Sequence, residues 1–431
     1  MAFSKDFIWC AGGAAAQQDG GYLDGGKGLN IWDALSDGHV RNNENCHVAC
    51  DHFHRWKDDL QLLKKIGVNT YRFSISLARL YPADEYTINE EGLKFYKDLV
   101  AELEFLGITP MCTLYHWDMP LWLHHKGGWK NSLAVEWFER FTKIVVDAIS
   151  DKVQYWITFN EPQCFIAMGY GTGEHAPFEK VGDGELKHIS RNVMLAHGKA
   201  VKTIRKYAKL QPKISYAPTA GLTIPTQNKS EKEAYERTFD INYGGAFCSA
   251  WWSDPIVLGK APKGCDWLSK DELKEICQPL DFYSFNIYNA NNGREFNLNY
   301  EGMPKTDMGW IITPECMYWG AKFFYERYKL PIMITENGMA NIDFVYGDGK
   351  VHDPQRSEYL RTHLKQLKRA NDEGIPVIGY ACWSLMDNFE WAEGYSKRFG
   401  LVYVNYQTQE RILKDSAYTY RDIIKTNGEI L

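Results

Sequence analysis

VQYWITFNEP, at residues 153–162, joins a run of aromatic and β-branched residues to an amide, a carboxylic acid and a proline. The run is typical of a buried strand. Proline cannot donate to a sheet ladder and disfavours helical backbone in the residue before it, so we expect the strand to end near Glu161. A carboxylate at the carboxyl end of a strand is well placed for catalysis in a barrel-like α/β protein. This stretch alone leaves open a solvated loop glutamate beside a helix-capping Asn160.

LPIMITENG, at residues 330–338, has the same form: an apolar run followed by Glu336 and then a turn. The pair Asn337-Gly338 predicts a tight turn with positive φ that closes the strand. Glu161 and Glu336 lie far apart in the sequence, and they converge only if the strands form a closed barrel. Two carboxylates facing each other across a pocket are the working groups of glycoside hydrolysis. The two stretches together therefore favour a catalytic pair.

TFNEP at 158–162 and ITENG at 334–338 resemble the two catalytic signatures of glycoside hydrolase family 1, the β-glucosidase family. The similarity continues through FIWCAGGAAAQQDGG at 7–21 and WSLMDNFEWAEGYSKRFGLVYV at 383–404, so it covers essentially the whole chain. The resemblance implies a retaining β-glycosidase of carbohydrate metabolism, most similar to the bacterial-type β-glucosidases. The expected substrate is a small β-glucoside or a short oligosaccharide with a terminal β-D-glucosyl residue, with side activity on β-galactosides and β-fucosides.

Strand-like and helix-like patterns alternate along the chain. We expect strands at 7–15, 69–74, 109–115, 154–160, 213–216, 280–286, 332–336 and 377–383. Helical periodicity is present near 52–66, 91–106, 133–150, 187–209, 231–248, 314–329, 354–373 and 415–425. Eight of each in alternation predict an α/β fold, a (β/α)8 TIM barrel forming one domain over residues 1–431. Residues 217–230, 287–313 and 337–353 are the expected extended active-site loops at the carboxyl ends of the strands.

Composition excludes several other classes of protein. The net charge is −6, and no basic run is long enough to indicate nucleic-acid binding. No window resembles a membrane span, and the first residues contain no hydrophobic region typical of a signal peptide, so we expect a cytoplasmic protein. The ten cysteines are scattered, which is typical of free thiols in a reducing compartment. The sequence does not indicate an oligomeric state.

One segment contains residues of the metal-ligating types: Cys46, His47, Cys50, His52 and His54. Their spacing matches no zinc pattern in which ligand pairs fall in tight loops. The segment also opens an amphipathic helix, and the matching block of the family carries no metal. We therefore expect neither a metal nor a cofactor.

The resemblance assigns roles around the two glutamates. Glu336 corresponds to the nucleophile, and Glu161 to the acid that protonates the leaving oxygen and later activates water. Arg72 and Tyr288 correspond to the residues that keep the nucleophile ionised. Asn160 matches the ligand of the sugar 2-hydroxyl, and Asn286 is expected with Tyr288 among the residues around the nucleophile. Two close carboxylates cannot both ionise freely, so the acid is expected to keep its proton at neutral pH.

The resemblance also implies a set of sugar ligands. These are Gln17, His116, Trp117, Trp383, Glu390, Trp391 and Phe399. The block around Gln17 departs from the family pattern, and Gln18 is the alternative at this position. On the aglycone side, Gln163 stands where many relatives have Trp, and Trp310 is available as a platform. These departures, with Leu77 in place of another Trp, suggest an altered aglycone preference for smaller or aryl groups.

Three alternatives remain on the same scaffold. The first is a 6-phospho-β-glucosidase, whose phosphate site uses Ser, Lys and Tyr in the last block. Here Lys397 is present, but Glu390 and Phe399 occupy the other two positions, and a glutamate repels phosphate. The second is a catalytically silent sugar-binding relative, which typically lacks one of the two glutamates. The third is a transglycosylase, which uses the same intermediate with a different acceptor.

Overall fold

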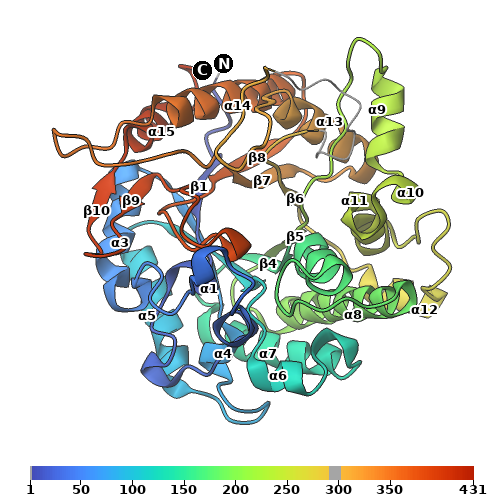
Figure 1. Cartoon of the computed structure of the whole chain (residues 1–431). Coiled ribbons are helices and arrows are strands. Elements are labelled where there is room, and N and C mark those ends of the chain that lie inside the picture. The colour runs from blue at the N-terminus through green and yellow to red at the C-terminus, as the bar shows by residue number, and fades with distance from the viewer. Residues whose placement is uncertain (1, 291–301) are drawn as a thin grey trace.

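Eight parallel strands surround a common axis in the computed structural model, which describes residues 2–290 and 302–431 (Figure 1). They are β1 Ile8–Gly12, β2 Thr70–Ser74, β3 Thr109–Tyr115, β4 Tyr155–Asn160, β5 Lys213–Ala217, β6 Tyr283–Asn286, β7 Ile332–Asn337 and β8 Val377–Cys382. Hydrogen bonding follows the order β5-β4-β3-β2-β1-β8-β7-β6, so the first strand pairs with the last. This arrangement confirms the predicted (β/α)8 barrel.

The seam between β5 and β6 is joined differently from the other strand pairs. A single parallel bridge links Thr219 to Asn286, whose backbone N–H donates to Pro218 and whose carbonyl accepts from Ala220. Lower in the seam, Ser284 Oγ donates to the carbonyl of Tyr216 at 2.8 Å. Side chains and isolated backbone bonds thus complete the barrel where a regular ladder is not formed.

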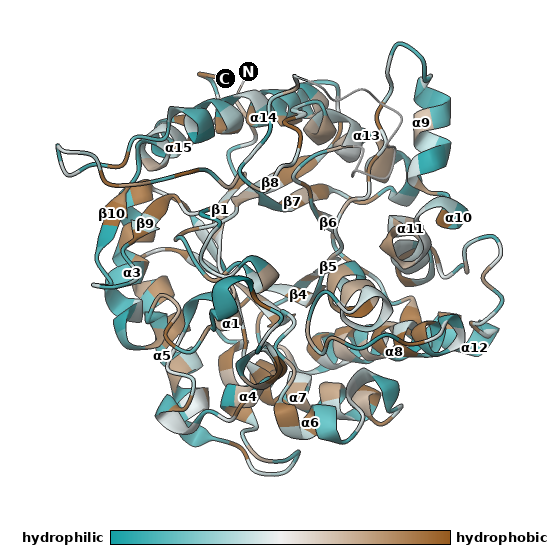
Figure 2. Ribbon diagram, in the orientation of Figure 1, coloured by the Kyte–Doolittle hydropathy of each residue, from teal (hydrophilic) through white to brown (hydrophobic). Residues whose placement is uncertain are grey.

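Helices cover the outside of the strands, as Figure 1 shows. The long ones are α3 His52–Ile66, α5 Glu90–Phe105, α7 Ala134–Ile149, α8 Asp183–Tyr207, α13 Cys316–Tyr328, α14 Pro354–Asp372 and α15 Asp415–Lys425. In α7 the buried residues Phe138, Phe141, Val145 and Ile149 recur every three to four positions, so one face packs inward. Peripheral α9 (Glu231–Thr238) is mainly hydrophilic in Figure 2. Within the described ranges, no helix is both long and apolar enough to cross a membrane.

Apolar side chains fill the interior of the barrel. One buried cluster is contributed by residues on or beside seven strands: Ile8, Cys10, Met111, Ile157, Ala217, Phe282, Met333 and Ala381. Because this cluster closes the axis, the barrel is not a pore. Polar side chains with catalytic chemistry are consequently confined to the carboxyl ends of the strands.

Most predicted elements are found within a few residues of their expected bounds, and three expectations need correction. The strand expected at 7–15 ends at Gly12, because Ala15–Gln18 forms the short helix α1, whose first N–H donates to Ser74 Oγ. The helix expected at 231–248 is broken into α9, α10 (Ile241–Gly244) and η5 (Gly245–Phe247). Gly245 has φ of 54°, which an α-helix does not allow.

The third correction concerns elements that the sequence did not predict. They include α2 Ile31–Leu35, α4 Leu77–Leu80, α6 Leu121–His125, the π-helix η4 Gln163–Thr172, α11 Ser249–Ser253, α12 Lys270–Ile276, and the hairpin β9 Val402–Val404 with β10 Arg411–Leu413. Several of these lie in the connections after strands. Of the loop expected at 287–313, residues 291–301 lie outside the described residues.

Candidate active site

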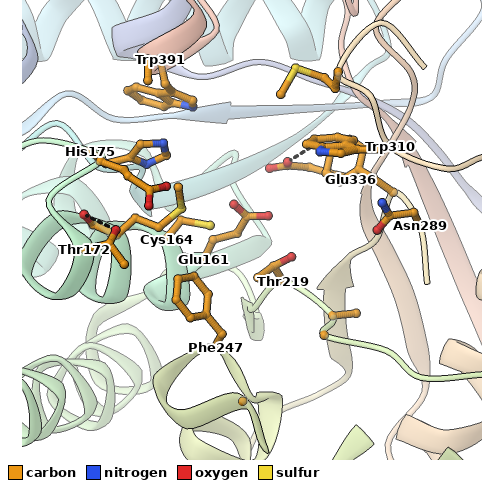
Figure 3. A pocket seen from close by; sticks show the side chains of 18 of the residues that line it. Glu161, Cys164, Thr172, His175, Thr219, Phe247, Asn289, Trp310, Glu336 and Trp391 are labelled. Carbon is orange, nitrogen blue, oxygen red and sulfur yellow. Dashed lines mark hydrogen bonds between the residues drawn. The ribbon is translucent and has the colours of Figure 1, made fainter. Parts of the chain in front are cut away.

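A cavity of about 1180 Å³ opens at the carboxyl ends of the strands, and both glutamates line it. Glu161 follows β4 directly, and Glu336 is the last residue but one of β7. Figure 3 shows both side chains pointing into the cavity. Each residue is more than nine-tenths buried. The barrel therefore brings the two predicted carboxylates into one enclosed space.

The turn after Glu336 differs from the prediction. Neither Asn337 nor Gly338 has positive φ. A Cβ on Gly338 would lie 1.9 Å from the backbone oxygen of Trp383, so any larger residue would clash with the end of β8. Glycine is required here for close approach of two strands, not for a left-handed turn.

Arg72, on β2, forms the centre of the polar network beneath the cavity. It is 1% exposed, and its guanidinium donates to Glu336 Oε1 at 2.6 Å, to Asn160 Oδ1 at 2.6 Å and to Thr113 Oγ1 at 3.1 Å. The other oxygen of Glu336 accepts from the hydroxyl of Tyr288 at 2.7 Å. Both oxygens of Glu336 are thus hydrogen-bonded in ways that favour the ionised form.

Asn286, at the end of β6, connects the two glutamates. Its amide N–H2 donates to Glu161 Oε1 and to Asn160 Oδ1, both at 2.9 Å. Its carbonyl oxygen accepts from Thr335 Oγ1 at 2.8 Å, which fixes the orientation of the amide. A continuous chain of hydrogen bonds therefore runs from Glu161 through Asn286, Asn160 and Arg72 to Glu336.

The two glutamates differ in their electrostatic surroundings. Burial raises the pKa of Glu336, but the charge of Arg72 and the hydroxyl of Tyr288 oppose this shift. Burial and the negative charge of Glu336 raise the pKa of Glu161 to about 8, and the Asn286 hydrogen bond opposes this only in part. The geometry can accordingly hold Glu336 ionised and Glu161 protonated near neutral pH.

The same network determines the state of His116, at the end of β3. Asn160 Oδ1 accepts from Arg72 and Asn286, so the Asn160 amide nitrogen faces His116 Nε2 at 3.2 Å. Burial, with the charge of Arg72, lowers the pKa of His116 well below its usual value. The ring is therefore neutral, with its proton on Nδ1. The indole N–H of Trp117 is already donated to the backbone of Asn160 at 2.9 Å, so it is not free for a sugar hydroxyl.

Gln17 and Glu390 lie together at another part of the site. Gln17 Nε2 donates to the carbonyl of Phe389 at 2.9 Å and to Glu390 Oε2 at 3.4 Å. Among the described residues its buried carbonyl oxygen has no partner, although Gln17 itself is not among the residues that line the cavity. Gln18 instead donates to Tyr71 in the core at 2.8 Å. Burial and the charges of the catalytic pair raise the pKa of Glu390 to about 8.

Aromatic rings form the remaining walls. The rings of Trp117 and Trp391 are stacked with centroids 4.5 Å apart. Trp383 and Phe399 belong to one apolar cluster, against which Trp310 packs. Trp310 lines the cavity on the side of Glu336, away from Glu161 (Figure 3). The structure therefore brings the expected aromatic ligands to one site.

Gln163 does not lie where we expected it. It is fully buried and is not part of the cavity wall. Its amide donates to the carbonyl of Thr219 at 2.9 Å and accepts from the Thr219 N–H at 3.3 Å. The side chain thus holds the loop after β5 by pairing with its backbone, and it cannot contact an aglycone directly.

Several cavity residues were not expected from the sequence: Thr172, His175, Thr219 and Phe247. The continuous helix expected at 231–248 gave no reason to place Phe247 in the cavity; in the structure this residue follows the break at Gly245 and lines the cavity. The π-helix η4 was also unforeseen, and it directs Cys164 and Met168 inward. No spacing in the sequence distinguishes these residues from ordinary packing residues.

The candidate metal-ligating segment does not converge on one point. His52 pairs with the buried Asp59 at 2.9 Å, and His54 pairs with Asp51 at 2.6 Å. Cys50 donates its thiol to a backbone carbonyl. In the part of the chain that the structure describes, no cluster of three or more His, Cys, Asp or Glu is arranged to hold a metal ion.

Comparisons with known proteins agree with this geometry. A family model described as glycosyl hydrolase family 1 matches residues 1–429. The chain is 40% identical to β-glucosidase A of Acetivibrio thermocellus and to a 1,4-β-D-glucan glucohydrolase of Thermotoga neapolitana, with 99% of each chain covered. Its fold matches the solved family 1 β-glucosidase of Thermotoga maritima with a TM-score of 0.91 at 39% identity, covering 99% of both chains. Another structure of that protein contains noeuromycin.

Proposed function

The chain belongs to glycosyl hydrolase family 1, and from this we propose that it is a retaining β-glucosidase that releases terminal β-D-glucosyl residues. One observation carries the proposal. Glu161 and Glu336 share a buried cavity; burial and the charge of Glu336 favour a proton on Glu161, whereas Arg72 and Tyr288 favour a charge on Glu336. A retaining glycosidase requires this division between acid and nucleophile.

In the first step, the carboxylate of Glu336 attacks the anomeric carbon while the bond from that carbon to the leaving oxygen breaks. Glu161 transfers its proton to this oxygen, and an ester forms between Glu336 and the sugar. The side-chain amide nitrogen of Asn160 carries two N–H groups, and one of them is directed to His116. The other donates to the sugar 2-hydroxyl, where contacts strengthen in the transition state. Arg72 and Tyr288 keep the attacking carboxylate ionised and oriented.

In the second step, Glu161 is ionised and removes a proton from water. The water oxygen bonds to the anomeric carbon, and the ester bond to Glu336 breaks, which restores both side chains. Two inversions retain the anomeric configuration. The Asn286 hydrogen bond favours the ionised form of Glu161, so it assists this step more than the first.

The sugar is held by the polar groups opposite the leaving-group side. Gln17 and Glu390 are assigned to the outer hydroxyls, His116 to a neighbouring hydroxyl, and Trp383 to the ring face. Trp391 and Phe399 support this wall. These groups bind glucose and tolerate the altered 4- and 6-positions of galactose and fucose, so side activity on β-galactosides and β-fucosides is expected.

Binding of a 6-phosphorylated sugar is disfavoured by side chains in the segment 383–404. Lys397, which matches the lysine of the phosphate site, donates to the carbonyl of Asp307 at 2.6 Å and to its carboxylate at 3.1 Å. Glu390 occupies the position where phosphate would lie, with a carboxyl group in place of the serine hydroxyl of the phosphate site. A silent relative is disfavoured because both glutamates and their partners are present. Transglycosylation is an outcome of the same intermediate when a sugar or alcohol replaces water.

We further propose that residues 1–431 act as one catalytic domain, since β1 pairs with β8 to complete the barrel. We place the enzyme in the cytoplasm because its ten cysteines, all in described parts of the chain, are free thiols. Separation of cell fractions followed by detection of the protein tests the location.

The test uses chromogenic β-glucoside, β-galactoside and 6-phospho-β-glucoside with wild type and Glu336→Ala. We expect turnover of the glucoside, loss of it in Glu336→Ala, and rescue by azide with an α-glucosyl azide as product. Glu358→Ala, at an exposed position on α14, is the matched control and should retain activity. Preference for the phosphorylated sugar, or no turnover by folded wild type, would overturn the proposal.

A further inference from the structure

Tyr288 gives the nucleophile one of its hydrogen bonds, yet it lies beyond the end of a strand. Its hydroxyl donates to Glu336 Oε2 at 2.7 Å. Because β6 ends at Asn286, Tyr288 belongs to the connection that follows the strand. On the cavity side its ring packs against Trp310 and Phe399, with centroids 5.2 and 5.9 Å away. These contacts position the ring but leave the backbone of Tyr288 to be fixed by other groups.

The carbonyl of Tyr288 is held from outside the barrel by Tyr359, on α14. The Tyr359 hydroxyl donates to this carbonyl at 2.8 Å and accepts from the side-chain amide nitrogen of Asn337 at 3.1 Å. Asn337 directly follows Glu336 in the chain, and the Tyr288 hydroxyl bonds back to Glu336. The bonds therefore form a closed circuit around the nucleophile, and Tyr359 joins its two halves.

The direction of each bond in this circuit is determined by its neighbours. The Tyr380 hydroxyl donates to Asn337 Oδ1 at 3.0 Å, so the amide nitrogen of Asn337 faces the other way. That nitrogen donates to the carbonyl of Ile287 at 2.7 Å and to the Tyr359 hydroxyl. Burial raises the pKa of Tyr359 well above its usual value, so the hydroxyl keeps its proton. Since it accepts from Asn337, it gives its own proton to Tyr288.

The position of the Tyr359 ring does not depend on its hydroxyl. The residue lies on the inner face of α14, where Leu360, His363 and Leu364 are also buried. The rings of Tyr359 and His363 are stacked with centroids 3.6 Å apart, and His363 Nδ1 donates to the carbonyl of Tyr359 at 2.8 Å. Tyr359→Phe would therefore keep the stacked ring and lose only the two hydrogen bonds of the hydroxyl.

We propose that Tyr359 is a positioning residue for the nucleophile, and that it acts by holding Tyr288 where the Tyr288 hydroxyl meets Glu336. The inference rests on the proposed function, since it requires Glu336 to attack the sugar. Tyr359 is 2% exposed and does not line the cavity, so a substrate does not contact it. Its effect on the reaction must pass through the residues to which it is bonded.

The test compares wild type, Tyr359→Phe, Tyr288→Phe and the variant with both substitutions. The assay is the pH dependence of kcat/KM for a chromogenic β-glucoside. In Tyr359→Phe a less well-placed hydroxyl stabilises the charge of Glu336 less, so the pKa of Glu336 rises. We expect the acidic limb to move to higher pH by about 0.3–1 unit and kcat/KM at neutral pH to fall about three- to tenfold. In the Tyr288→Phe background, adding Tyr359→Phe should change kcat/KM by less than about twofold.

A matched control separates this effect from a general loss of stability. Tyr420, on α15, is also fully buried, and its hydroxyl donates to the carbonyl of Cys10 at 2.9 Å. Neither of these two residues lines the cavity. Tyr420→Phe should lower the midpoint of chemical denaturation about as much as Tyr359→Phe does, and should keep the pH profile of wild type. The other ionisable groups around Glu336 are unchanged in both variants: Arg72, Glu161, Cys164 and Glu390.

The outcomes separate this inference from the proposed function. If folded wild type does not turn over the glucoside, the proposed function fails. If it does, but the acidic limb stays in place in Tyr359→Phe, ring packing alone positions Tyr288 and the inference is wrong. Equal losses from Tyr359→Phe with and without the Tyr288 hydroxyl would also overturn it. The same holds if Tyr359→Phe does not fold or is far less stable than Tyr420→Phe, because the hydroxyl then serves the fold.

Discussion

Replacing Arg72 with methionine is the perturbation that most directly tests the electrostatic design of the site. The change removes one charge and keeps a similar volume, so Glu336 loses its 2.6 Å charge-assisted hydrogen bond and retains that of Tyr288. Such a bond contributes about 1.5–3 kcal/mol, and about 1.4 kcal/mol corresponds to one pKa unit. We therefore expect the pKa of Glu336 to rise by about 1–2 units.

The sign of the effect on activity follows from the role of Glu336. A nucleophile must be ionised, and activity is lost as pH falls through its pKa. Raising that pKa moves the acidic limb of the kcat/KM profile to higher pH. Because Glu161 and Glu336 are coupled, the two limbs report the pair. The charge of Arg72 also lowers the pKa of Glu161, so the basic limb should move to higher pH as well. Arg72 is hydrogen-bonded directly to Glu336, so the acidic limb should move further, and the pH profile should become narrower and lower.

The assay is the pH dependence of kcat/KM for an aryl β-glucoside in wild type, Arg72→Met and Arg72→Lys. Lysine keeps the charge without the planar fork, so its acidic limb should move less. Chemical denaturation should show a loss of about 3–5 kcal/mol in Arg72→Met, because a buried partner is left unpaired. An acidic limb that stays in place, or moves to lower pH, would refute the reasoning even if activity falls.

Other predictions follow from the same geometry. Glu161→Ala should lower kcat/KM for benzyl glucoside by about 10²–10⁴ and affect glucosyl fluoride much less, since fluoride leaves without a proton; equal losses would contradict the acid role. Asn286→Ala removes a bond that favours ionised Glu161, so the basic limb of the pH profile should move up by about one unit, and a downward shift would reverse the argument. Gln163→Trp should reduce the free energy of unfolding by about 1–3 kcal/mol, because two backbone groups of Thr219 lose their partner, and should alter the ranking of aglycones indirectly by displacing the loop after β5; an unchanged ranking would contradict this effect of the loop. Wild-type kcat/KM for a 6-phospho-β-glucoside should be at least about 100-fold below that for the glucoside, and parity would contradict the assignment of Glu390.

The sequence was most informative where one strong local pattern determines structure. The apolar runs before Glu161 and Glu336 end in residues that break a strand, so both positions could be predicted within a residue. The helices at 52–66 and 415–425 were also found at their expected bounds, because an amphipathic pattern of three to four turns leaves little choice.

Prediction was least successful where a long-range contact decides the conformation. Gln163 follows a strand and is polar, yet its amide completes the backbone pairing of a distant loop. The sequence pattern predicts a turn at Gly338, whereas the constraint on this residue is the carbonyl of Trp383, which directly follows β8. Phe247 reaches the cavity through a helix break whose position depends on tertiary packing. None of these contacts produces a periodic pattern in the sequence from which it could be predicted.

The irregular junction between β5 and β6 has a consequence for how the enzyme responds to heat. The backbone of Asn286 forms hydrogen bonds across this junction, and its side-chain amide donates to Glu161 and Asn160. A local fluctuation that parts the junction therefore withdraws the group that aligns Glu161, while the other strands remain paired. Partial opening of this kind requires less free energy than global unfolding. We expect thermal inactivation to begin at temperatures where the secondary structure is still intact.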